Sequence, residues 1–156
     1  MATKIITAKE LDPDYRAYPV DEHGKYRLQY GSFVNVGAGD AGSTIEVCEL
    51  PPGRVRILPY ASRFSLSALG AARLMKIGHH AYNDRSTPST ADAVVEDDDA
   101  FAVGLDVSAA TNAVVWSNAI KYDIFSRAGV KVFATITGGT IPDGAVGQFL
   151  LAYIYE

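Results

Sequence analysis

The sequence predicts an all-β protein, folded as an antiparallel sandwich or barrel with an extended N-terminal arm. Apolar and polar side chains alternate over residues 130–137, which is the period of a strand with two different faces. Similar short segments recur along the chain, separated by turn-forming residues, as in sandwiches and barrels. Strands and helices do not alternate, which argues against a parallel, doubly wound sheet.

The C-terminal stretch, residues 130–155, has the clearest pattern. Two apolar strands are joined by segment 138–144, which is rich in glycine and contains proline and aspartate. One face of the first strand holds Val130, Val132, Ala134 and Ile136. In the second strand one face holds Phe149, Leu151, Tyr153 and Tyr155, and the other holds Leu150, Ala152 and Ile154. Because both faces are apolar, this strand either lies under cover on both sides or turns one face to another copy.

Residues 1–25 differ from the rest of the chain. Pro13 and Pro19 each restrict the preceding residue to extended geometry, and no helical period is present. We therefore expect an extended arm over 1–25 and a sandwich domain over 26–156. The alternative is an ordinary irregular leader that lies on its own domain.

Further strands are expected between the arm and the C-terminal pair. They cover residues 26–36, 43–50, 54–58, 62–67, 73–78, 101–107, 113–116 and 120–125. Segment 62–77 would also suit a helix, but strand–turn–strand is the favoured interpretation. The polar segment 82–99 is expected to be a long surface loop.

Composition excludes several classes of function. With 156 residues, 48% hydrophobic and 21% charged, the chain fits one globular domain. The net charge of -4 argues against nucleic-acid binding through bulk charge. One cysteine rules out an internal disulfide, and no apolar run approaches the ~20 residues that span a bilayer. The start also lacks the apolar core of a signal peptide, so we expect a soluble protein made in a cytoplasm, with no membrane partner.

Motifs that suggest chemistry have simpler explanations. Segment 37–42 fits G-x-G-x-x-G but is followed by a strand, so a hairpin loop is favoured over a dinucleotide site. The acidic run 96–99 lacks the spacing of a calcium loop and is interpreted as an acidic surface loop. His79 and His80 would point to opposite faces of a strand, which argues against a shared metal ion. Cys48 has no recognisable nucleophile context and is expected to be a buried apolar residue. We expect no catalytic residue, no metal and no cofactor.

A family resemblance rests on turns and strands. Segment 50–57, LPPGRVRI, resembles the L-P-A-G-x-V turn and strand of small virion proteins of tailed bacteriophages. Segments 68–71, ALGA, and 74–78, LMKIG, resemble the turn and strand that follow in those proteins. Segment 135–144, TITGGTIPDG, resembles their C-terminal turn. The similarity covers roughly residues 43–155 and leaves out the arm. It implies a β-sandwich, often jelly-roll-like, that decorates or cements the capsid shell, and it supplies no catalytic residue.

The expected function is therefore capsid decoration: a cement protein that binds and stabilises the shell of a tailed phage. The expected partners are the major capsid protein and further copies of the chain itself, as a trimer in preference to a dimer. The expected location is the capsid surface, after synthesis in the cytoplasm of a bacterial host. The expected contact residues are Tyr15, Arg16 and Tyr18 in the arm and Phe149, Leu151 and Tyr153 in the last strand.

Three other functions stay open. A carbohydrate-binding sandwich, such as an adhesion module, would be favoured by an exposed Trp116 with polar neighbours, although core or interface packing of the aromatics is preferred. Another virion component, of the tail or baseplate, would suit the same surface properties. A small hydrolase on a jelly roll would need two carboxylates, or a histidine–carboxylate pair, facing one cleft.

Overall fold

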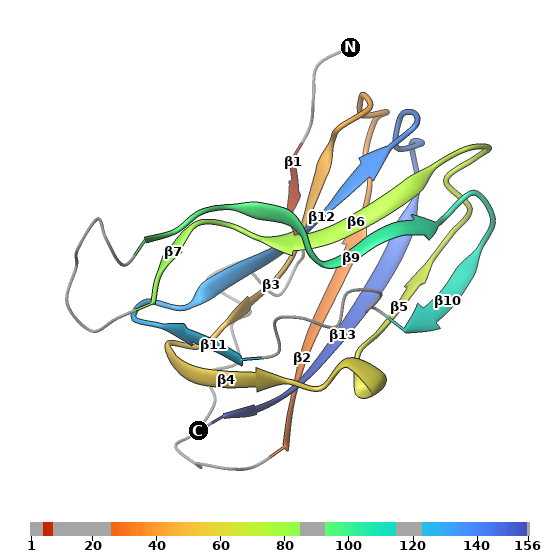
Figure 1. The fold of residues 1–156 in the computed structure, drawn as a ribbon. Helices are drawn as coiled ribbons and strands as arrows, with labels where there is room; N and C mark the ends of the chain where they lie inside the picture. Colours follow the sequence, from red (N-terminus) through yellow and green to blue (C-terminus); the bar gives the residue numbers. More distant parts are fainter. Residues whose placement is uncertain (1–4, 8–25, 85–92, 115–122, 156) are drawn as a thin grey trace.

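The computed structural model describes residues 5–7, 26–84, 93–114 and 123–155, and it consists of two β-sheets that face each other (Figure 1). The five-stranded sheet has the order β1-β3-β12-β6-β9. Its strands are β1 (Ile5–Thr7), β3 (Thr44–Leu50), β12 (Val130–Thr137), β6 (Leu74–His79) and β9 (Asp97–Asp106). This confirms the expected β-sandwich.

The six-stranded sheet is organised around β13 (Val146–Tyr155), which lies at its centre (Figure 1). Along one side β13 pairs with β2 (Tyr26–Val34), and along the other side it pairs first with β5 (Arg63–Leu66) and then with β4 (Gly53–Ile57). The outer strands β10 (Thr111–Val114) and β11 (Asp123–Ser126) pair with β5 and β4. A short 3-10 helix, η3 (Pro59–Ala61), separates β4 from β5.

The strand pairing has the wrapped arrangement of a jelly roll. β2 pairs with β13 in one sheet, β3 pairs with β12 in the other, and both pairs are antiparallel. β6 and β9 form the next pair, and the β4–β5 segment pairs with β10 and β11. Each of these ribbons is antiparallel, and together they enclose one core, as in a jelly roll.

The core is filled by the inward positions that the alternating pattern predicts. Phe149 is 2% exposed, and its ring stacks against Phe33 and Phe64 with centroids 6.4 and 6.3 Å apart. The inward residues of β12 are all buried, namely Val130, Val132, Ala134 and Ile136. Burial of large apolar side chains is the main favourable term in folding, so these positions hold the two sheets together.

Gly147 is required where β13 passes over this aromatic cluster. A methyl group at that position would collide with the side chains of Phe33 and Leu66. A glycine in a strand interior has no side chain to pack, and here that absence makes room for the ring of Phe33 and the side chain of Leu66.

The ambiguous segment 62–77 forms two strands, as the favoured interpretation predicted. β5 ends at Leu66, a turn follows, and β6 begins at Leu74. Ala72 lies in this turn with a φ of 59°, a left-handed conformation that non-glycine residues rarely adopt. Segment 37–42 is followed by a strand, β3, which agrees with the argument against a dinucleotide site. The expected hairpin is wrong, because β2 and β3 belong to different sheets and the segment crosses from one sheet to the other.

The expected surface loop over 82–99 is wrong at both of its ends. Tyr82–Asn83 (β7) pairs with Ala93–Val94 (β8), and Asp97 to Asp99 begin β9. The acidic residues tolerate a strand because Lys76 on β6 contacts two of them: its Nζ lies 3.2 Å from an oxygen of Asp98 and 3.8 Å from an oxygen of Asp99.

The N-terminal segment contributes one described strand. β1 pairs in parallel with β3, with Ile6 opposite Ile45, and forms one edge of the five-stranded sheet. The described part of the chain contains no helix that is long and apolar enough to cross a membrane.

Candidate interaction surface on the six-stranded sheet

The last strand divides its residues between the core and the outer surface. Phe149, Leu151 and Tyr153, which we expected to contact another subunit, are 2%, 1% and 2% exposed. Burial also raises the pKa of Tyr153. The structure therefore places these three side chains in the core of their own chain. Their apolar character is explained by packing against the opposite sheet, so the surface offered to partners must come from other residues.

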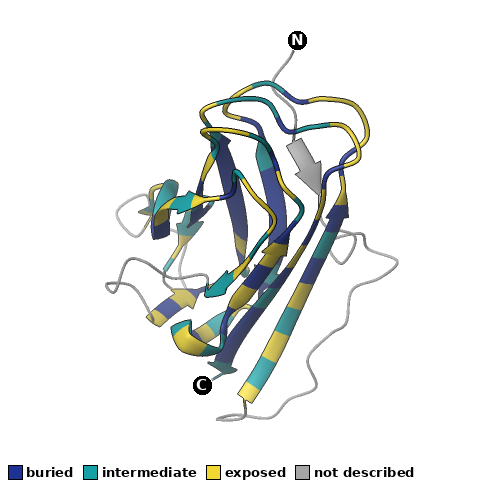
Figure 2. Ribbon diagram, turned by 90° about the vertical axis from the view of Figure 1, so that its right-hand side faces the viewer, coloured by how far each residue is buried: buried dark blue, intermediate teal, exposed yellow. Residues whose placement is uncertain are grey.

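The outer face of the six-stranded sheet is unusually apolar along β2. Tyr26, Leu28, Tyr30 and Val34 are 54%, 52%, 41% and 64% exposed, and all four point outward. Figure 2 shows this alternation along the long strand β2, where exposed and half-buried residues follow one another. Single exposed apolar residues are common, but a row of four on one face is typical of an interaction surface.

The register extends this row across the sheet at one end. Ile154 lies opposite Tyr26 and Ala152 lies opposite Leu28. Ala152 is fully buried, whereas Ile154 is half-buried. We call Tyr26, Leu28 and Ile154 the apolar end. On the far side of β13, Phe125 on β11 is 48% exposed.

Charged groups border the apolar end. Arg56 Nε lies 2.9 Å from Asp123 Oδ1, and an Nη atom of Arg54 lies 3.4 Å from Asp123 Oδ2. The hydrogen bond from Arg56 is the main reason why the pKa of Asp123 is lowered. These groups are about half exposed, so they contribute more to the choice of partner than to the stability of the fold.

Farther along the same face, a row of polar residues lies between Tyr30 and the exposed pair Val34 and Val146. Gln148 on β13 lies directly between Ser32 on β2 and Ser65 on β5, and Ser65 lies opposite Asn112 on β10. We call these four residues the polar row. They come from four adjacent strands and cross the sheet at right angles to the chain direction.

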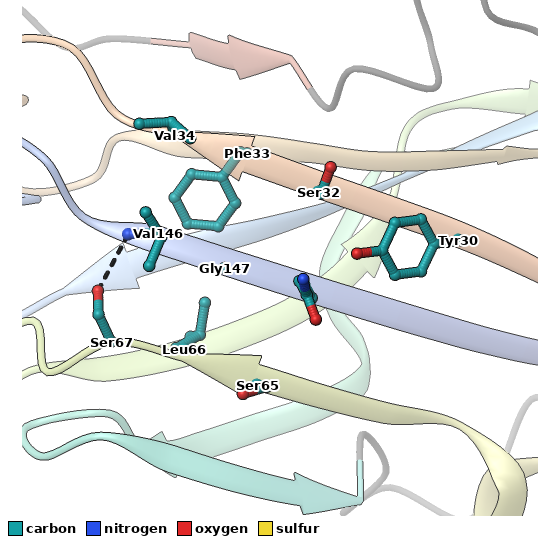
Figure 3. A pocket seen from close by; sticks show the side chains of 10 residues that line it. Tyr30, Ser32, Phe33, Val34, Ser65, Leu66, Ser67, Val146 and Gly147 are labelled. Carbon is teal, nitrogen blue, oxygen red and sulfur yellow. Dashed lines mark hydrogen bonds between the residues drawn. The ribbon is translucent and has the colours of Figure 1, made fainter.

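The polar row lies in a depression. One hollow of about 730 Å³ and a neighbouring one of about 250 Å³ share Tyr30, Ser65 and Gln148 among their lining residues. Figure 3 shows the larger hollow, with Ser32 and Ser65 on the flanking strands and the ring of Tyr30 beside them. At its far edge Ser67 Oγ accepts a hydrogen bond from the backbone N–H of Val146 at 3.0 Å.

The outer face of the five-stranded sheet is different in character. His80 Nε2 lies 2.6 Å from Glu46 Oε1, and His80 Nδ1 lies 2.6 Å from Glu96 Oε2. The imidazole also stacks on Phe133, with centroids 4.4 Å apart. Burial lowers the pKa of His80, but the hydrogen bonds to the two glutamates outweigh it and raise the pKa above its usual value.

This arrangement favours a positively charged histidine rather than a catalytic one. Both ring nitrogens face carboxylates, so both must carry a proton to donate. Glu46 is 7% exposed, and a buried carboxylate requires such a counter-charge. A histidine–carboxylate pair was the feature that a hydrolase would need, but here no ring nitrogen is left to accept a proton from a nucleophile.

The acidic residues of β9 are held by a cation of the chain itself. The carboxylates of Asp97, Asp98 and Asp99 have oxygens within 4.8 Å of one another. The hydrogen bond from Lys76 to Asp98 is the main cause of the raised pKa of Lys76. His79, next to His80 in sequence, is 1% exposed and points inward, so the two histidines lie on opposite faces as expected.

Several expected contact residues lie outside the described part of the chain. These are Tyr15, Arg16 and Tyr18 of the arm. Trp116, whose exposure would favour a carbohydrate-binding sandwich, also lies outside the described residues. The exposed residues Tyr26, Leu28 and Tyr30 were not predicted as contacts, although their alternation with Arg27 and Gln29 was visible in the sequence. Period two identifies a strand with two faces, but it does not say which face is covered.

Comparison with known proteins relates the chain to viral capsids by fold only. No protein-family model matches the sequence, and no curated protein matches it significantly. A chain in the capsid of Ralstonia phage GP4 has a similar structure, with a TM-score of 0.68 and 15% identity over 97% of this chain and 98% of that one. A chain of the cyanophage Pam1 capsid asymmetric unit is also similar, with a TM-score of 0.56 and 14% identity over 90% of this chain and 92% of that one. At these identities the likeness establishes a shared fold, which extends over nearly the whole length of all three chains.

Proposed function

We propose that this chain is a structural protein of a tailed-phage virion, and that it decorates or cements the capsid shell. The observation that carries the proposal is the likeness in fold to chains from two phage capsids, which covers at least nine-tenths of each chain compared. A fold by itself does not imply a function, so the surface must also suit the role.

The apolar end of the outer face suits docking onto a protein shell. Tyr26 and Leu28 are each about half exposed, and an aromatic side chain buries a large area at low entropic cost. Burial of apolar surface contributes roughly 25 cal/mol per Å², so a few hundred Å² at this end contributes several kcal/mol before the entropic cost of association. Many copies on one shell act together, so modest affinity at each site is sufficient.

The chemistry of the described residues supports a binding role rather than an enzymatic one. The histidine–carboxylate contact on the five-stranded sheet has both ring nitrogens occupied. The two hollows on the six-stranded sheet are lined by hydroxyl, amide and apolar side chains, together with Arg63, and contain no carboxylate. A paired-carboxylate mechanism therefore has no support there.

The same proposal includes partners and location. The major capsid protein is the proposed partner, and self-association is proposed as a trimer in preference to a dimer. The arm residues Tyr15, Arg16 and Tyr18 remain proposed contacts. The proposed location is the outer surface of the virion, after synthesis in the cytoplasm of the bacterial host. A tail or baseplate position is the alternative that imaging of the virion would reveal.

The test is binding to phage shells that lack this protein, measured by co-sedimentation. The wild-type chain should saturate the shells at a fixed number of copies, and Leu28→Asp should weaken binding by about tenfold or more, since it places a charge in an apolar contact. Val103→Asp is the matched control, because Val103 is an apolar residue 44% exposed on β9, which belongs to the other sheet. Failure of the wild-type chain to bind shells, or its absence from the head in imaged virions, would refute the proposal.

A further inference from the structure

We propose that the polar row and Tyr30 form a binding trough for a linear, uncharged oligosaccharide. The inference rests on the register of four strands and does not depend on shell binding. It gives the chain a second surface with a ligand chemistry different from that of the apolar end.

The dimensions of the trough fit a short sugar chain. Adjacent strands lie about 4.8 Å apart, so a row across four strands is about 14 Å long. Ser32, Gln148, Ser65 and Asn112 occupy successive strands along this length. The first three line the hollow of about 730 Å³, which is within the range of small-molecule sites in proteins, and Asn112 lines the neighbouring hollow of about 250 Å³.

The trough offers the hydrogen-bonding groups that sugar hydroxyls need. A serine hydroxyl both donates and accepts, and an amide presents donors and an acceptor side by side. Ser65, Gln148 and Asn112 are all exposed, and within the described residues none of these three makes a side-chain hydrogen bond. Sugar hydroxyls also donate and accept, so the two sets of groups are complementary without any net charge.

Tyr30 supplies the apolar half of the recognition. Its side chain lines both hollows and is 41% exposed, and in Figure 3 the ring lies along the sheet beside the polar residues with its hydroxyl directed into the hollow. One face of a sugar ring carries mainly C–H groups, which pack against an aromatic ring, while a tyrosine keeps a polar tip for a hydrogen bond. The polar row alone would provide hydrogen bonds but no aromatic surface for the C–H face of a sugar.

Other ligand classes fit this trough less well. A nucleic acid would need several cations along its backbone, but Arg63 is the one charged side chain among the residues that line the two hollows. A protein partner would favour an apolar centre with a polar rim, whereas here the polar row crosses between the exposed apolar side chains of Tyr30 on one side and Val34 and Val146 on the other. An extended peptide would seek a free strand edge, and the polar row lies on a sheet face.

The trough and the apolar end adjoin on β2 and separate on β13. Leu28 and Tyr30 are two residues apart on β2, which corresponds to about 7 Å at 3.3 Å per residue, whereas Gln148 and Ile154 are six residues apart on β13, about 20 Å. A partner on the apolar end therefore borders the trough at Tyr30 and lies farther from Gln148.

The test uses the full chain and four series of linear, uncharged oligosaccharides, built from glucose, mannose, xylose or N-acetylglucosamine. Binding is measured by ligand-observed NMR and by titration calorimetry. At least one series should bind with a Kd in the millimolar range or tighter, and affinity should rise up to about three sugar units and then level off, because the trough is about 14 Å long.

Variants assign the binding to the trough. Tyr30→Ala should weaken the affinity by about tenfold or more and Gln148→Ala by severalfold, while Tyr60→Ala, which removes a tyrosine outside the trough, should leave it unchanged. Ser65→Trp, which fills the trough from an exposed position, should abolish binding without lowering the melting temperature.

Two results would overturn the inference. The first is that no series binds the wild-type chain, and the second is that binding survives in both Tyr30→Ala and Ser65→Trp. Shell binding measured on the same variants separates the two proposals. Trough variants that lose sugar binding but still bind shells support both the sugar site and the shell-binding role. Trough variants that keep sugar binding but lose shell binding assign the trough to the shell interface.

Discussion

The substitution Phe149→Ala tests whether the last strand serves the core or a contact with another copy. Phe149 is 2% exposed and lies between the rings of Phe33 and Phe64. If the sandwich folds as described, the substitution removes the centre of an aromatic stack and leaves a cavity that the opposite sheet cannot fill.

The expected loss is large for a chain of this size. Replacement of a buried phenylalanine by alanine costs about 3–5 kcal/mol, which combines the lost transfer free energy and the cavity. For a domain of this length each kcal/mol lowers the melting temperature by about 2–4 °C, so a fall of roughly 6–20 °C is expected. Tyr60→Ala, at a 91% exposed position, should change the free energy of unfolding by less than about 0.5 kcal/mol.

Thermal melting followed by circular dichroism at two protein concentrations measures this effect. A core role predicts the same fall in melting temperature at both concentrations, since the lost contacts lie within one chain. A fall of less than about 2 °C, or one that appears only at the higher concentration, would refute the reasoning and assign Phe149 to a subunit contact.

Three further outcomes are expected. The pKa of His80 is raised in the folded state, so its contribution to stability is fully present below the unfolded pKa of about 6.5 and is lost as the pH rises through the folded pKa. His80→Gln should therefore flatten this part of a plot of melting temperature against pH. An unchanged slope would contradict the assigned hydrogen bonds. Gly147→Ala should destabilise the fold by about 1–3 kcal/mol in urea denaturation, because the added methyl group collides with Phe33. Gly144→Ala tests backbone strain alone, because a methyl group at Gly144 has no neighbour within contact distance but the residue has a φ of 73°. Asp123→Asn should cost less than about 1 kcal/mol, since its ion pairs are exposed, and a larger loss would show that they organise the sheet edge.

The strands themselves could be predicted from local pattern. The inward residues of β12 and the division of 62–77 into two strands follow from alternation and turn residues, which act over a few positions. The acidic start of β9 could not be predicted in this way. Its strand conformation depends on pairing with β6, where Gly78 leaves room for the backbone of Asp97 and Asp98 to approach closely.

The candidate surface was harder to predict than the fold. In β2, the apolar residues Tyr26, Leu28 and Tyr30 point outward, whereas the pattern by itself would place them inside. The first half of β2 has no fully buried position, and burial begins only at Gly31. Its inward side chains up to that point are Arg27 and Gln29, which lie only partly covered.

For this protein the sequence alone determined the class of structure, because the choice between strand and helix is encoded in neighbouring residues. The outward face of β2 and the polar row were decided only by the tertiary structure. The row joins Ser32, Ser65, Asn112 and Gln148, which are separated by dozens of positions along the chain. Their alignment depends on the register of three strand pairs, and a shift of one residue in any of them would turn a member of the row toward the core.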